Sequence, residues 1–285
     1  MATATDAHRG PRPRWHGRLA LGFVRDGERT VVERRDVCMP LAMQRPFYPE
    51  GARVAHVLAL HPPGGMVGGD RLDIALDVQP GAEALVSTPA AAKWYRGVAR
   101  AAQQVRHRVA ENGRLEWLPQ ETIVFDGADV EQNLRVELEA GATWFGWDIT
   151  RFGRSARGER FSAGTWRMAT EVWRDGAPLW VDRQRLEGGS RLLSSRFGLA
   201  DAPVVGTAAW IGRVATAALV DAARAAWDDA RLEGEGGVTR LEEGMLCRYR
   251  GPSSAAARSW FIAVWELLRM YDRNRPACAP RIWST

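Results

Sequence analysis

The sequence has almost no lysine and few of the residues that build metal or redox sites. Lys93 is the only lysine among 39 lysine and arginine residues, a bias that we attribute to codon composition. Cys38, Cys247 and Cys278 lie far apart and form no CxxC pair, which argues against structural zinc and a disulfide framework. The five histidines form no HExxH motif, so tight metalloenzyme chemistry is not expected. This composition fits a reduced, cytoplasmic protein.

Long apolar runs and dense basic runs are also missing. No stretch approaches the roughly 18 uncharged apolar residues of a membrane helix, so membrane association is not expected. Residues 1–14 are rich in arginine and proline but have no apolar segment, which predicts a flexible basic tail rather than a secretory signal. The net charge of +5 is spread along the chain, so the sequence does not predict nucleic-acid binding.

The sequence does contain long stretches in which apolar and polar residues alternate. Residues 72–78 and 134–138 place an apolar side chain at every second position, which is typical of strands with one buried face. Asn-Gly and Asp-Gly pairs between such runs are hairpin turn signals. We expect further strands at Leu19–Val24, Val31–Val37, Val54–Leu60, Val105–Val109, Ile123–Phe125, Thr165–Val172, Leu179–Leu186 and Val238–Tyr249.

Two segments near the C-terminus change to helical spacing. Val214–Trp227 is alanine-rich, and Ser254–Asp272 carries apolar residues three and four positions apart. Residues 74–82 and 134–142 share one pattern of strand, turn and apolar run, which favours units that stack. We therefore expect a mainly β protein with a stacked-strand, β-helix-like or layered body. Residues 15–285 would form a single domain, with two α-helices near the C-terminus.

The most unusual segment is the glycine-rich stretch from His61 to Asp70, HPPGGMVGGD. It is not a phosphate-binding loop, because no Lys-Ser/Thr follows and the next segment alternates as a strand. It could be a strained connection between strands, or a loop that presents His61 and Asp70 to a ligand. Lys93, beside two aromatic residues, is either a needed ammonium group or an ordinary surface charge.

Acidic residues also occur within apolar or aromatic segments. Glu121 and Asp126 lie in LEWLPQETIVFDG, and Asp148 follows WFGW; an ionised group in such surroundings needs a partner or water. A glycosidase would need two carboxylates at a set separation, which a sequence does not give. A Ser/His/Asp triad has no G-x-S-x-G support. From the residues alone, a binding or assembly protein is slightly favoured over an enzyme.

These segments, in order, resemble the UreD (UreH) family of urease accessory proteins. The matching stretches are HPPGGMVGGDRLDI (61–74), STPAAAKWYR (87–96), LEWLPQETIVFDGA (115–128), GWDITRFGRSARGERF (146–161) and LLSSRFGLADAPVVGT (192–207). The resemblance spans most of the chain. It implies a non-catalytic, mostly β chaperone with two helices near its C-terminus.

The resemblance also implies partners and a cargo. Family members bind UreF, which recruits the GTPase UreG, and the assembly delivers nickel to apo-urease through a water-filled internal route. No permanent cofactor is expected, only transient Ni²⁺. Sparse carboxylates would pass the ion on, whereas thiolate clusters would hold it. The candidate nickel-contacting residues are Asp70, Glu121, Asp126, Asp148, Glu187 and His61. Each acid could equally be a buried structural residue paired with an arginine, and His61 could simply order its loop.

The last helix carries apolar groups on more than one face. Trp260, Phe261 and Leu267 are therefore candidate contacts for UreF, and a fully internal helix is the alternative. A carbohydrate-binding or carbohydrate-cleaving β protein remains the alternative function. Two close carboxylates in an open cleft would favour it.

Overall fold

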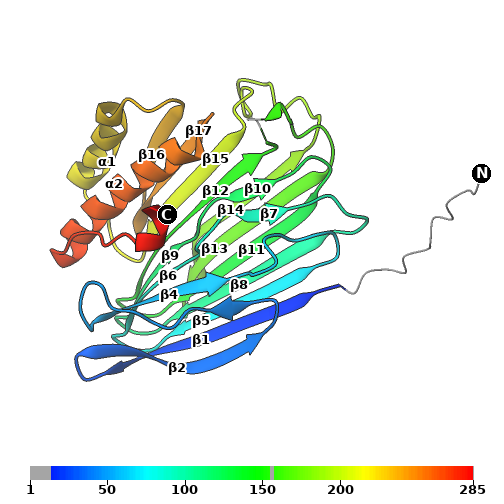
Figure 1. Cartoon of the computed structure of the whole chain (residues 1–285). Coiled ribbons are helices and arrows are strands. Elements are labelled where there is room, and N and C mark those ends of the chain that lie inside the picture. Colours follow the sequence, from blue (N-terminus) through cyan, green and yellow to red (C-terminus); the bar gives the residue numbers. More distant parts are fainter. Residues whose placement is uncertain (1–13, 155–156, 285) are drawn as a thin grey trace, which may run out of the picture.

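The computed structural model describes residues 14–154 and 157–284, and Figure 1 shows their arrangement. Apart from Arg14, the expected N-terminal tail lies outside the described residues. Two β-sheets lie face to face, and two helices cover the outer face of one of them. The predicted mainly β, layered body with two helices near the C-terminus is confirmed.

The first sheet has seven strands in the order β14-β13-β11-β8-β5-β1-β2. Most neighbouring strands are parallel, with antiparallel pairs only at its two edges. The strand bounds are β1 (His16–Asp26), β2 (Arg29–Cys38), β5 (Arg71–Val78), β8 (Ala101–Val109), β11 (Asp129–Leu138), β13 (Thr165–Arg174) and β14 (Ala177–Glu187).

The second sheet has ten strands, with β16-β17-β15-β12-β9-β6-β4-β3 as its main path and β10 and β7 paired beside β12. The chain passes from one sheet to the other between β5 and β6, between β8 and β9, and between β11 and β12. The strand bounds are β3 (Ala42–Met43), β4 (Val54–Leu60), β6 (Glu83–Ser87), β7 (Ala92–Trp94), β9 (Arg114–Leu118), β10 (Thr122–Val124), β12 (Thr143–Phe152), β15 (Val204–Ile211), β16 (Glu235–Leu241) and β17 (Gly244–Gly251).

These three passages share one type of turn. Gly81, Asn112 and Gly141 each stand three residues after a strand of the first sheet, and each has a positive φ near 60° (68°, 56° and 68°). Glycine and asparagine adopt this left-handed conformation most readily. The turns stack, since the amide of Gly81 donates to Glu111 and the amide of Asn112 donates to Ala140. This winding explains the parallel strands and the sequence echo, and it adds a third copy at residues 105–113.

The two sheets enclose one apolar core, and the second sheet and the helices enclose another. The central strands of the second sheet are therefore buried on both faces, as the nearly continuous burial of β4, β6 and β15 shows. The helices are α1 (Ala217–Ala230), capped by the Thr216 hydroxyl, and α2 (Ser254–Arg273), capped by Ser253. A short 3₁₀ turn follows at Arg281–Ser284. Neither described helix combines the length and the apolarity needed to cross a bilayer.

Candidate functional site

A cavity of about 100 Å³ lies between the two sheets, with a mainly apolar lining that also includes several polar side chains. Side-chain amides, hydroxyls and one carboxylate line it together with aromatic rings, and its volume accommodates several water molecules. The polar lining consists of Thr88, Gln103, Gln120, Thr122, Gln132, Asn133, Asp148, Thr170 and Thr207. Neither histidine nor cysteine contributes to this lining, so the cavity offers only oxygen and amide groups to an ion.

Asp148 on β12 is the one acid that lines this cavity. Its neighbours Trp147 and Ile149 belong to the core under the helices, so the alternation of the strand turns Asp148 inward between the sheets. The pKa of Asp148 is raised to about 8, chiefly by burial and then by the nearby charge of Asp182, while Arg248 acts in the opposite sense. At neutral pH the carboxyl is therefore mostly protonated and uncharged.

The cavity adjoins a groove on the surface. Thr207 on β15 lines both the cavity and this groove, which has a volume of about 500 Å³. Arg248 also lines the groove, and it forms an ion pair of 3.1 Å with Asp182 on the opposite sheet. Thr207 is the register partner of Asp148 on the neighbouring strand, so both residues lie close to a charged pair that joins the two sheets.

The glycine-rich loop places Asp70 and His61 near each other without a shared hydrogen bond. The Asp70 carboxylate is buried and accepts hydrogen bonds from the amides of Trp15 (3.1 Å) and Val67 (3.0 Å). Burial lowers the pKa of His61, and the charge of Asp70 opposes that shift. Asp70 therefore orders the C-terminal part of its loop and joins it to the residue before β1.

Glu121, Asp126 and Glu187 occupy three separate environments, none of them the cavity. Glu121 pairs with Arg258 of α2, and the half-exposed Glu187 pairs with Arg185. Asp126 accepts hydrogen bonds from the amides of Ser162 (2.6 Å) and Ala163 (2.9 Å). Burial would raise the pKa of Asp126, but these hydrogen bonds outweigh it and lower that pKa. Of the predicted acids, only Asp148 faces the cavity between the sheets.

The structure corrects the predicted partner contacts on α2. Trp260 and Phe261 are fully buried, and the indole of Trp260 donates to the carbonyl of Ala223 in α1 (3.1 Å). Both rings fill the core between the helices and the second sheet, so neither lies on a contact surface of the folded chain. Leu267 is partly buried, whereas Met270 and Tyr271 are the exposed large apolar residues of α2.

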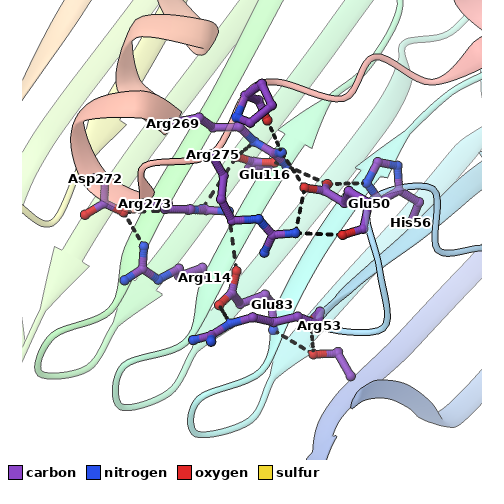
Figure 2. A network of polar contacts seen from close by, with 12 residues as sticks. Glu50, Arg53, His56, Glu83, Arg114, Glu116, Arg269, Asp272, Arg273 and Arg275 are labelled. Atoms are coloured by element: carbon purple, nitrogen blue, oxygen red, sulfur yellow. Dashed lines mark hydrogen bonds and ion pairs between the residues drawn. The ribbon is translucent and has the colours of Figure 1, made fainter. Parts of the chain in front are cut away.

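An ion network joins α2 to the second sheet, and no local sequence pattern predicts it (Figure 2). All five N–H donors of the buried Arg269 are used: two bind Glu116, two bind Glu50 and one binds the carbonyl of Pro276. The indole of Trp265 also donates to Glu116 (3.0 Å). Arg269 and its two acids therefore hold the helix end against the sheet, and we call them the Arg269 clamp.

Two negative findings bear on the choice of chemistry. Within residues 14–154 and 157–284, no group of three or more His, Cys, Asp or Glu side chains could hold a metal ion. The cavity between the sheets also has a single carboxylate in its lining, whereas glycoside hydrolysis uses two. The cavity therefore lacks the carboxylate pair of a glycosidase.

Comparison with known proteins identifies the family. The model of the UreD urease accessory protein matches residues 16–284. The chain belongs to the UreD family. It is 53% identical over 270 residues to the urease accessory protein UreD of Acaryochloris marina (strain MBIC 11017), covering 94% of this chain and 95% of that protein. The UreD proteins of Nostoc punctiforme and Azoarcus sp. (strain BH72) are 49% and 44% identical, each with at least 95% of both chains covered. These relatives are named accessory proteins rather than enzymes.

Proposed function

We propose that this UreD-family chain is a urease maturation chaperone that binds UreF, acts with the GTPase UreG on apo-urease, and passes nickel toward the urease active site. The family membership supports the role in urease maturation. The observation that supports the proposed passage of nickel is the cavity between the sheets, which has one partly buried acid, Asp148, in its lining and shares Thr207 with a surface groove.

The chemistry of Asp148 suits an ion in transit. A carboxyl with a pKa of about 8 is uncharged when the cavity holds only water, which limits the cost of keeping it buried. An entering Ni²⁺ would displace the proton and gain one carboxylate ligand. Amides and hydroxyls such as those of Gln132 and Thr207 would complete a weak, exchangeable shell. Such a shell releases its ion, whereas a thiolate cluster would retain it.

The test compares Asp148→Asn with Glu137→Gln in cells that produce urease, UreF and UreG. Asparagine keeps the shape of Asp148 but has no proton to exchange for nickel. Glu137 is an exposed acid paired with Arg135 and serves as the matched control. We expect Asp148→Asn to lower the nickel content and the activity of urease several-fold, with UreF and UreG still co-purifying. Normal nickel loading with Asp148→Asn would refute the cavity route, and loss of UreF binding would indicate a structural role for Asp148.

A further inference from the structure

Four arginines line a second pocket, where the end of α2 meets the turns that begin β4, β6 and β9. Its volume is about 250 Å³, and it lies beside the Arg269 clamp (Figure 2). The residues that line it are Arg53, Arg114, Arg273, Arg275, Glu83 and Asp272. This pocket is separate from the cavity between the sheets and has no part in the proposed nickel route.

The acids of this pocket are buried, and part of the arginine charge faces solvent. The side chains of Glu83 and Asp272 are 4% and 3% exposed. Arg53, which bonds Glu83 at 2.6 Å, is 56% exposed, and Arg275 is 30% exposed. Four guanidinium groups therefore face two carboxylates, and the accessible part of the pocket is mainly cationic.

The residues behind the pocket do not remove this excess of positive charge. Glu50 and Glu116 approach Arg275 and Arg273 at 3.4 and 3.5 Å, but both acids are already bound by Arg269. Arg213 adds another positive charge, at 3.1 Å from Asp272. The network then contains six arginines and four acids, while Glu28, whose charge also acts on Arg53, is itself paired with Arg25. A surplus of two positive charges remains for a ligand to neutralise.

Arg273 has hydrogen-bond donors to spare. Its side-chain nitrogens lie 3.5–3.6 Å from oxygens of Glu83, Glu116 and Asp272, and no hydrogen bond joins this side chain to another described residue. A guanidinium has five N–H donors in a fixed fork that fits two oxygens of one anion. Arg273, only 11% exposed at its side chain, is thus held by charge alone.

The same surplus of positive charge acts on Arg114. It pairs with Asp272, yet burial lowers its pKa, and the charge of Arg273 lowers it further. The positive form of Arg114 is therefore less stable here than in water. An anion in the pocket would relieve this repulsion between neighbouring guanidinium groups.

We propose that this arginine pocket binds an oxyanion of the phosphate or carboxylate class. Arg273 and Arg114 form its inner wall, and Arg53 and Arg275 form its rim. Planar guanidinium groups recognise the paired oxygens of such anions in bidentate fashion. The anion is either a free ion in solution or a carboxylate side chain of a protein that docks at this end of α2.

The first measurement is calorimetric titration of the full-length chain with inorganic phosphate and with citrate. The double variant Arg53→Gln/Arg275→Gln removes the two most exposed arginines of the pocket, and Arg273 still approaches Glu83 while Arg269 still binds Glu50. The control is Arg224→Gln, because Arg224 is 53% exposed and bonds only one acid side chain, Asp221, on α1. We expect saturable binding by the wild type, about tenfold weaker binding by the double variant, and unchanged binding by the control.

A competition experiment distinguishes a free anion from a protein carboxylate as the ligand. A short glutamate-rich peptide is added to the chain saturated with phosphate. Displacement of phosphate supports the pocket as a site for a protein carboxylate, and no displacement supports it as a site for the free ion. The proposal is overturned if the wild type binds neither phosphate nor citrate at millimolar concentrations, or if Arg224→Gln weakens binding as much as the pocket variant. Absence of binding by the wild type would overturn the proposal whether or not the double variant folds.

Discussion

Arg269 and Glu116, separated by 153 positions in the sequence, form a two-bond ion pair with both side chains 2% exposed. Glu116 stands in the middle of β9, and Arg269 stands one turn before the end of α2. This pair fixes where α2 lies on the second sheet. It also places Arg273, one turn further on, in the arginine pocket.

Replacing Arg269 with methionine should destabilise the fold by about 3–5 kcal/mol, because Glu116 and Glu50 would remain buried without their main partner. Urea unfolding measures this loss. Arg269→Lys should be intermediate, since an ammonium keeps the charge but lacks the planar fork. Arg224→Met, on the exposed side of α1, is the matched control and should change stability by about 0.5 kcal/mol or less. A small effect of Arg269→Met would show that the clamp does not hold the helix.

The raised pKa of Asp148 predicts an unusual dependence of stability on pH. The folded chain binds the Asp148 proton more tightly than the unfolded chain, so this residue's contribution to stability is complete below pH 3.8 and is lost as the pH rises to about 8. Asp148→Asn removes this effect. The stability of the variant relative to the wild type should therefore increase by at least about 2 kcal/mol between about pH 5 and about pH 8.5.

Urea unfolding of both proteins at the two pH values tests this relation. Asp126→Asn is the contrasting control, because hydrogen bonds lower the pKa of Asp126 instead of raising it. A stability difference between Asp148→Asn and the wild type that does not change with pH would mean that Asp148 is ionised in the folded chain.

The burial of Trp260 predicts that changes there act through the fold. Trp260→Ala should cost about 3–5 kcal/mol, as for other large-to-small changes in a core. Met270→Asp and Tyr271→Asp change residues that are 44% and 47% exposed, and should leave the melting temperature nearly unchanged. If the outer face of α2 contacts UreF, the pair of exposed changes should reduce co-purification. Full retention of UreF by this folded variant would exclude that face.

The turns between the sheets predict two different costs for the same substitution. Gly81→Ala should cost about 1 kcal/mol, because the residue has a φ of +68° but open space around its missing Cβ. Gly164→Ala should cost clearly more, since its Cβ would also meet the carbonyl oxygen of Ala128 at 2.2 Å. Chemical unfolding of the two variants side by side measures the difference. Equal costs would mean that the backbone at Ala128 moves aside freely.

Much of the fold could be predicted because the strands of the first sheet have one buried face and alternate accordingly. In the second sheet β6, β9, β12 and β15 are buried on both faces by the other sheet and the helices, so alternation is absent and these strands were not predicted as such. The alanine-rich pattern predicts a helix from Val214, three residues before α1 begins, because the pattern includes Thr216 and the two residues before this cap.

The site was predictable only where a single residue stood out from its neighbours. Asp148 is an acid that follows a run of aromatic residues in the sequence, and it lines the cavity in the structure. Glu116 stands in a similar segment, but its partner comes from α2, and nothing local in the sequence distinguishes Arg269 from the many other arginines. The pocket of four arginines depends on the same long-range packing. Its members come from residues 53, 114, 273 and 275, which no local pattern connects.

The central claim, that nickel passes through the cavity between the sheets, is tested most directly at Thr207, where the cavity meets the surface groove. Thr207→Leu adds bulk at this junction, and Thr207→Val keeps the size of the side chain. The measurement is the number of nickel ions bound per urease active site after maturation with each variant, with equal recovery of UreF and UreG. We predict a several-fold loss with leucine and a much smaller change with valine. Full nickel loading of urease by a folded Thr207→Leu chain would contradict the account.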